Sequence, residues 1–264
     1  MSDLADAVQR AHLNLVDSSK QLFELDPTAG VEAKEAWLLG AGISSHPVIS
    51  NAAFRRDDDL DPNHLLDRAT QFFGDRGRRF SLWTRGGRDE DRDLVAAAEV
   101  AGLQFVYEMP EMVLSRPVEE PSLPDGAELQ RLTMAEQAED FWRITASAYA
   151  SNGFPPEVFA GYTNHAGLLA ENVVAFLAYL DGVPVSIAMT IVRHGVAGVY
   201  WVGSLEQARG RGLGHAVTAA ATNAGFELGA ELASLQASPM GKPVYLRMGY
   251  ETVYDYRLFM SPAP

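Results

Sequence analysis

Three glycines and two arginines stand together in the segment Glu206–His215, which reads EQARGRGLGH. An apolar run rich in Val, Tyr and Trp precedes it at Gly198–Leu205, and an alanine-rich run without proline follows at Ala216–Phe226. This order predicts a strand, a glycine loop and a helix. Glycines let a backbone approach a ligand closely, and the unpaired N–H groups at a helix start attract anions. With Arg209 and Arg211 added, the loop predicts a phosphate or pyrophosphate site.

A strand-to-helix turn that needs glycine only for its geometry is the alternative to a ligand site. Such a turn would not require arginines, so we favour the phosphate interpretation. Two other phosphate motifs do not fit. A Walker loop ends in Gly-Lys-Ser/Thr, whereas this loop ends Gly214-His215-Ala216. A dinucleotide fingerprint needs a third glycine where His215 stands.

Read as Arg209-x-x-Gly212-x-Gly214, the loop resembles the acyl-CoA pyrophosphate signature, R/Q-x-x-G-x-G/A, of the GNAT acetyltransferase superfamily. The resemblance implies that acetyl-CoA is the co-substrate, that no metal is needed, and that the strand before the loop splays around a bulge, for which Gly203 is suited. The backbone of that strand would bind the pantetheine amides. The residues expected to bind the cofactor are Val202, Ser204, Arg209, Gly210, Arg211, Gly212, Leu213, Gly214, His215 and Ser238.

A second segment, residues 238–250, reads SPMGKPVYLRMGY and is similar to the superfamily's N-x-x-A-x-x-L-Y-x-x-x-G-F/Y segment. Tyr245 and Gly249-Tyr250 match this pattern. Ser238 stands where Asn is usual, and Gly241 where Ala is usual. Ser238 could contact pantetheine, cap the following helix, or do both. Two motifs in this order, joined by one helix and one strand, make the resemblance specific.

The resemblance implies direct attack of an amine on a thioester, with Tyr245 as the catalytic general acid for the departing thiolate. A core tyrosine packed under the cofactor is the alternative. No general base is evident; His165, His194 and His215 are the candidates, although lone histidines are more often structural. The residues that lie where the superfamily shapes its acceptor pocket are Tyr149, Asn152, Phe154 and Trp201.

The chain of 264 residues carries a formal net charge of −14 and has no cysteine. The net negative charge argues against a nucleic-acid-binding surface. It would attract a cationic amine substrate, and the alternative is that it serves only to keep the surface soluble. Without cysteine there is no disulfide, thiolate metal site or thiol nucleophile. No secretory signal and no apolar run of membrane-spanning length is visible, so we expect a cytoplasmic protein without membrane partners. The oligomeric state stays open.

The segment Arg116–Gly126, with three prolines and a glycine, divides the chain nearly in half. We therefore expect an accessory or degenerate GNAT-like domain at 1–116, a linker at 117–126 and a GNAT acetyltransferase domain at 127–264. The fold class expected is α/β with a mixed sheet. Residues 102–108 and the strand after them parallel residues 249–255 and their strand, which suggests a tandem repeat. The first half has no R-x-x-G-x-G loop, so it should bind no CoA.

Hydrophobic spacing and turn signals predict the other elements. Thr133-x-x-Glu136 is expected to form a capping box, and Asp181-Gly182 to close a hairpin. Helices are expected at 4–25, from 62, at 89–101, 133–149, 156–162, 216–226 and 240–248, and strands at 36–39, 48–54, 80–84, 112–114, 128–132, 173–180, 183–192, 199–204, 232–237 and 252–260.

Two functions therefore remain. The first is an acyl-CoA-dependent N-acyltransferase that moves an acetyl group to a primary amine of a small molecule or peptide. The second is a non-catalytic module that binds acyl-CoA as a sensor or scaffold. Both need the glycine loop, whereas Tyr245 favours the enzyme.

Overall fold

The computed structural model describes residues 2–26, 28–42, 44–151, 153–159 and 165–263. By internal contacts the chain divides into two compact units. Unit 1 holds Met1–Ser18 and Met112–Glu251, and unit 2 holds Ser19–Glu111 and Thr252–Pro264. The two units therefore interleave in the sequence, whereas the division expected at 117–126 is continuous. That continuous division stays a prediction about where one repeat ends and the next begins.

Unit 1 contains a mixed sheet in the order β5-β10-β9-β8-β7-β6, to which β5 (Gln104–Leu114) contributes only its last residues. The other strands are β6 (Ala127–Arg131), β7 (Val173–Leu180), β8 (Val183–Arg193), β9 (Val196–Ser204) and β10 (Leu232–Gln236). The helices are α1 (Ser2–Phe23, to Ser18), α4 (Ala135–Ala150), α5 (Leu213–Glu227) and α6 (Lys242–Met248), with short 3₁₀ turns η2 (Pro156–Val158), η3 (His165–Leu169) and η4 (Glu206–Ala208).

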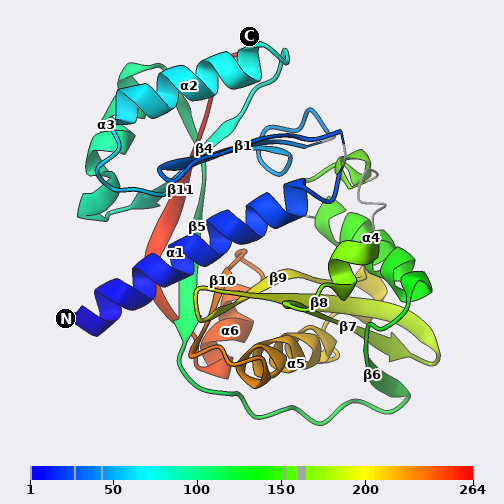
Figure 1. The fold of residues 1–264 in the computed structure, drawn as a ribbon. Helices are drawn as coiled ribbons and strands as arrows, with labels where there is room; N and C mark the ends of the chain where they lie inside the picture. Colours follow the sequence, from blue (N-terminus) through cyan, green and yellow to red (C-terminus); the bar gives the residue numbers. More distant parts are fainter. Residues whose placement is uncertain (1, 27, 43, 152, 160–164, 264) are drawn as a thin grey trace. The chain divides into compact units, whose positions relative to one another are not determined.

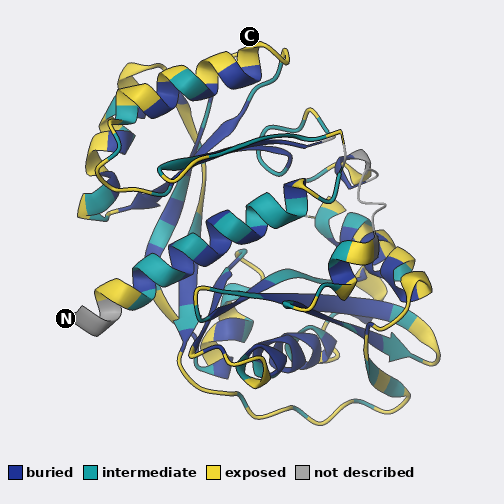
Figure 2. Cartoon of the chain, in the orientation of Figure 1, coloured by how far each residue is buried: buried dark blue, intermediate teal, exposed yellow. Residues whose placement is uncertain are grey.

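Helices cover both faces of the unit 1 sheet. The view in Figure 1 shows α5 on one side of β7–β9, and α1 and α4 on the other. The α5 helix lies very close to β9, because a Cβ at Gly225 would come within 2.2 Å of the Ala197 Cβ. Most of α5 is buried, as its dark colour in Figure 2 shows. Its alanines and Gly225 allow this close packing against the sheet.

The strands of unit 2 follow the order β1-β2-β3-β4-β11-β5, with both antiparallel and parallel pairs among them. Its strands are β1 (Gly30–Ala33), β2 (Trp37–Ala41), β3 (Asn51–Arg55), β4 (Ser81–Gly86), the first part of β5, and β11 (Glu251–Met260) from Thr252 onward. Its helical elements are α2 (Pro62–Gly74), η1 (Asp89–Asp91) and α3 (Arg92–Val100). The helix predicted from residue 62 is confirmed as α2, and the residues it buries are Leu65, Leu66, Ala69, Phe72 and Phe73.

The two halves of the chain repeat one order of elements. In the first half, β2 and β3 are antiparallel, β3 and β4 are parallel, and α2 connects the parallel pair. In the second half, β8 and β9 are antiparallel, β9 and β10 are parallel, and α5 connects that pair. Each half then adds a helix, a glycine with positive φ (Gly102, 77°; Gly249, 95°) and a long strand. The similarity of residues 102–108 to 249–255 thus marks the same place in both halves.

Some predicted elements differ from the structure. Strand β1 was not predicted, because its four half-buried residues carry little apolar pattern. The capping box expected from Thr133 and Glu136 is wrong: the helix begins one residue later, so Gln137 reaches back and accepts hydrogen bonds from the N–H of Thr133 at 2.8 Å and Met134 at 3.1 Å. The predicted hairpin is confirmed, with Asp181 and Gly182 both at positive φ. Of the helix predicted at 156–162, residues 160–162 lie outside the described part.

Candidate active site

A pocket of about 520 Å³ opens within unit 1 where β9 ends and α5 begins. Its walls come from the end of α4, the last residues of β9, the glycine loop, the start of α5 and the segment that leads into α6. The structure brings ten sequence-predicted site residues to this pocket: Val202, Ser204, Arg209, Gly210, Gly212, Leu213, Gly214, His215, Ser238 and Tyr245.

The glycine loop turns through two glycines with positive φ, Gly210 at 76° and Gly212 at 81°. Gly212 is the N-cap residue of α5, so the helix start points its first N–H groups at the pocket. Arg209 is half-buried beside these groups, and its Nη2 donates to Ser151 Oγ at 2.8 Å. Such a loop, with a helix dipole and a guanidinium, fits the diphosphate of a nucleotide-type cofactor.

Strand β9 separates from its parallel neighbour as it approaches the pocket. Its pairing with β10 covers Val196–Gly198 opposite Leu232–Ser234. Beyond Gly198, β9 continues to Ser204 beside the pocket. The backbone of Val202 and Ser204 therefore lies at an opening between two strands, where an extended chain with amide groups could add hydrogen bonds like a strand.

A bulge lies in the separated part of β9. On β8, Ile187 pairs with Gly203 and Met189 pairs with Tyr200, so two steps along β8 match three along β9. Trp201 takes up the extra residue at φ 52°, an unusual conformation for a large side chain. The bulge was predicted, but Trp201 rather than Gly203 carries the positive φ.

The end of β9 is held in place by side chains around it. Gly203 lies so close to α4 that a Cβ there would be 2.8 Å from the Ala148 Cβ. Ser186 Oγ donates to the carbonyl of Gly203 at 3.0 Å and lies 2.7 Å from Ser204 Oγ. Arg209 Nε donates to the carbonyl of Ser204 at 3.3 Å. The strand end and the glycine loop are thus fixed to each other.

Tyr245 is buried in the pocket wall, with 7% of its surface exposed. Burial raises the pKa of its hydroxyl, so the group stays protonated at neutral pH and can donate a proton but not act as a resting base. Its ring lies 6.1 Å from that of Tyr250, whose hydroxyl is 2.7 Å from Thr222 Oγ1 on α5. The contact between Tyr250 and α5 fixes the helix that carries Tyr245.

The two departures from the family pattern both have local explanations. Ser238 Oγ accepts a hydrogen bond from the N–H of Gly241 at 3.1 Å, so it stabilises the turn that leads into α6, while Ser238 also lines the pocket. Gly241 lies under the ring of Tyr245, and a Cβ there would be 2.7 Å from a ring carbon. Glycine at this position leaves the space that the tyrosine ring occupies.

Arg247 also lines the pocket, and sequence reasoning did not identify it as a site residue. Its side chain is exposed at the end of α6, and its charge acts on His215. Burial, with Arg247 as a second cause, lowers the pKa of His215. The basic residue in the last turn of α6 was the only signal for Arg247, and such residues usually serve the helix end.

An aromatic cluster adjoins the pocket at Tyr149. The ring centroid of Tyr149 lies 5.4 Å from Trp201, 5.6 Å from Phe159 and 6.3 Å from Phe154. Trp142 lies 6.0 Å from Trp201 on the inner side of α4. Burial, with Tyr245 nearby as a second cause, raises the pKa of Tyr149. The residues expected at the acceptor pocket thus gather beside the bulge, apart from Asn152, which lies outside the described residues.

Three other predicted residues are placed elsewhere or not described. Arg211 is exposed and does not line the pocket. His194 lies in the β8–β9 turn, where its Nε2 is 2.7 Å from Asp17, so it is not at the site. The side chain of His165 lies outside the described part. Of the three candidate bases, His215 is therefore the one that the described structure places in the pocket.

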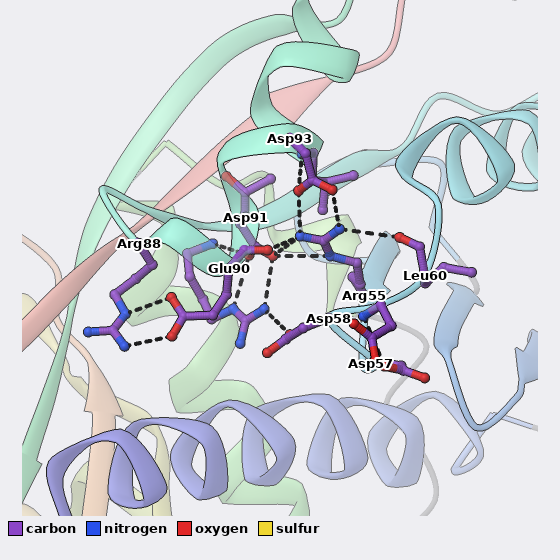
Figure 3. Close-up of polar contacts among 12 residues, drawn as sticks. Arg55, Asp57, Asp58, Leu60, Arg88, Glu90, Asp91 and Asp93 are labelled. Carbon is purple, nitrogen blue, oxygen red and sulfur yellow. Dashed lines mark hydrogen bonds and ion pairs between the residues drawn. The ribbon is translucent and has the colours of Figure 1, made fainter. Parts of the chain in front are cut away.

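Unit 2 has charged side chains where unit 1 has the pocket. Figure 3 shows Asp91 beside Arg55, which ends β3. Asp91 lies 2.8 Å from Arg55 Nη2 and 2.9 Å from Arg85 Nη2, and all three residues are 1% exposed. Asp58, in the loop between β3 and α2, also pairs with Arg85 at 2.6 Å. The loop, at 56–61, contains four aspartates and no glycine, so it would repel phosphates.

The comparisons agree with this geometry. Residues 122–237 match the family model of the acetyltransferase (GNAT) domain. Those residues are therefore similar to that domain, and the chain has the GNAT fold. Among solved structures, a GCN5-related N-acetyltransferase from Kribbella flavida is 22% identical with a TM-score of 0.72, covering 96% of each chain. No match was found among curated proteins.

Two further structures support a GNAT fold across both halves. A GCN5-related N-acetyltransferase from Sphaerobacter thermophilus is 14% identical with a TM-score of 0.65, covering 89% of this chain and 84% of that one. A tandem GNAT protein from the clavulanic acid biosynthesis pathway is 14% identical with a TM-score of 0.62, covering 90% and 85%. The family supports an acetyltransferase-type function.

Within the described residues, no helix is long and apolar enough to cross a membrane.

Proposed function

We propose that the chain is an N-acetyltransferase that moves an acetyl group from acetyl-CoA to a primary amine by direct attack. The observation that carries this proposal is the convergence of three parts in one pocket. These are the glycine loop with Arg209, the separated end of β9, and the protonated hydroxyl of Tyr245. A phosphate site, an amide-binding strand edge and a proton donor together match the chemistry of an acyl-CoA thioester.

The residues of the pocket fit acetyl-CoA, which when bound supplies the thioester carbonyl that the amine attacks. The N–H groups at the start of α5, together with Arg209, would bind the diphosphate. The backbone around Val202 and Ser204 would bind the pantetheine amides. Tyr245 would donate its proton to the departing sulfur, and water would regenerate the tyrosine. The amine must lose one proton during attack, and ordered water would accept it, because His215 beside the diphosphate would already carry its own proton.

A non-catalytic acyl-CoA-binding module remains the second candidate, because the glycine loop serves both functions. The acceptor would be a small-molecule or peptide amine, which the net charge of −14 would attract if it is cationic. A thiol-release assay with acetyl-CoA and a panel of small amines, amino acids, aminoglycosides and peptides separates the candidates. Amine-dependent thiol release supports the enzyme, whereas cofactor binding without any release supports the module.

We expect one acetyl-CoA to bind per chain. The place in unit 2 that corresponds to the pocket is filled by the Arg55–Asp91–Arg85 ion pairs and faces an aspartate-rich loop. Isothermal titration calorimetry measures the stoichiometry directly. Two equivalent sites would show that the charged cluster opens to admit a second cofactor.

Cofactor binding is expected to take up protons through His215. Its pKa lies below the usual value in the free protein, and a bound diphosphate would raise it by favouring the imidazolium. The affinity for acetyl-CoA should therefore rise as the pH falls through the pKa that His215 has in the complex. The rise should level off below the pKa that His215 has in the free protein. Calorimetry in buffers of different ionisation enthalpy measures the uptake. His215→Asn is the control for protons taken up by the cofactor itself, and equal uptake in both proteins would refute the role.

A further inference from the structure

The α1 helix is attached to unit 1 through one buried amide. Asn14 is 0% exposed, and its Nδ2 donates to the carbonyls of Ile191 at 3.0 Å, Arg193 at 3.2 Å and Val196 at 2.8 Å. These carbonyls belong to the end of β8 and the start of β9. Asn14 therefore satisfies backbone groups around the β8–β9 turn, which would otherwise be costly to bury.

The other end of the same amide contacts the strand that leads to the pocket. Tyr200 donates from its hydroxyl to Asn14 Oδ1 at 2.6 Å. Gly198 lies beneath this hydrogen bond: a Cβ there would be 2.1 Å from Asn14 Oδ1 and 2.4 Å from the Tyr200 hydroxyl oxygen. Only glycine at position 198 leaves room for the contact between helix and strand.

This contact coincides with the point where β9 changes partners. Gly198 forms the last pair of β9 with β10, and Trp201 begins the bulge directly after Tyr200. Neither Asn14 nor Tyr200 lines the pocket, whereas Val202 and Ser204 further along the strand do. A displacement of β9 at Tyr200 would thus be transmitted to the residues that face the cofactor and to Trp201 in the aromatic cluster.

We propose that Asn14 and Tyr200 are positioning residues for acyl transfer, acting through the backbone of β9. This inference rests on the proposed function. The hydrogen bond holds the strand at its point of separation and so fixes the bulge relative to the helix start that binds the diphosphate. An enzyme site needs this precision, because a misplacement of about 1 Å can reduce turnover about 10²-fold. Binding of the diphosphate does not need this precision in β9, because the glycine loop and the start of α5 provide the contacts to the diphosphate.

Tyr200→Phe is the decisive variant, since it removes the hydroxyl and keeps the ring. We expect kcat to fall about 10-fold or more with the best acceptor amine, while the Kd for acetyl-CoA changes by less than about threefold. Arg10→Gln is the matched control, because Arg10 also anchors α1 within unit 1, through Glu231 at 2.9 Å, and does not line the pocket. The control should keep its kcat even if its melting temperature falls.

A double-mutant cycle adds a second test. If Asn14 and Tyr200 act through one hydrogen bond, the effects of Asn14→Leu and Tyr200→Phe should not add. The kcat of the double variant should then be close to that of the less active single variant. Unchanged kcat in Tyr200→Phe would overturn the positioning role alone. The same holds if Arg10→Gln loses as much kcat as Tyr200→Phe for the same fall in melting temperature. An inactive wild-type protein that binds acetyl-CoA would instead overturn the proposed function, and this inference with it.

Discussion

Gly212→Asp is expected to abolish measurable acetyl-CoA binding in a protein that still folds. Gly212 caps α5 with φ at 81°, and its Cβ position is open toward solvent, so an aspartate fits at the cost of modest backbone strain. The carboxylate would then stand at the helix start where the diphosphate is proposed to bind. Two like charges 4 Å apart near a protein surface repel by about 4 kcal/mol, which corresponds to about 10³-fold in affinity.

Gly229→Asp is the matched control for the backbone strain. Gly229 has φ at 91° in equally open space at the other end of α5, and it does not line the pocket. Calorimetric titration should give wild-type affinity for this control and none for Gly212→Asp. Gly214→Val gives a second, uncharged test, because a Cβ there already lies 3.4 Å from Ser204 Oγ and a branched side chain would crowd the pocket. Tight binding in both folded loop variants would refute the diphosphate site.

Tyr245→Phe is expected to reduce kcat about 10²-fold while leaving acetyl-CoA affinity nearly unchanged. The substitution removes the proposed proton donor and keeps the ring that packs on Gly241 and near Tyr250. Positioned acid–base groups typically contribute about 10² to 10⁴ in rate. The lower end applies here, since the thiol of coenzyme A is a moderate leaving group that water can partly assist. Rate measurements with the best acceptor, beside calorimetry with the cofactor, check both expectations.

Tyr250→Phe is the control for the loss of a buried hydroxyl. Tyr250 is 1% exposed and its hydroxyl is bonded to Thr222, but it does not line the pocket. Its variant should lose stability, by about 1 to 3 kcal/mol if the threonine hydroxyl is left unsatisfied, and keep its turnover. Normal kcat in Tyr245→Phe at its optimum pH would exclude the acid role, and a loss that matches a fall in melting temperature would assign Tyr245 to structure.

The local features of the site could be read from the sequence because each depends on residues close together in the chain. Gly210 and Gly212 supply the positive φ of the loop, and the alanine-rich run after them forms α5. Asp181-Gly182 specifies its hairpin turn in the same way. The motif spacing placed Tyr245 in the second half, and the structure puts its ring in the same pocket as the loop.

Contacts between distant residues could not be read in this way. Arg247 reaches the pocket because α6 packs beside the start of α5, and Arg211 does not, although it stands inside the motif. The buried Arg55–Asp91–Arg85 group joins the ends of two strands and a 3₁₀ turn, whereas in sequence Asp91 stands in a run of charges that is typical of a solvated turn. Charge runs have no periodicity that reveals which member is buried.

The sequence alone indicated the resemblance to the superfamily, the glycine loop and the position of Tyr245, because short motifs fix local backbone conformation and the chemistry of its side chains. Only the tertiary structure decided which unit each segment belongs to. Asn14 lies far from Tyr200 in sequence, yet the two residues form a hydrogen bond, and α1 up to Ser18 belongs to unit 1. The strand β11, by contrast, belongs to unit 2 from Thr252 onward. Strand pairing and helix docking depend on which surfaces meet after folding, and hydrophobic pattern specifies that a face is buried without specifying its partner.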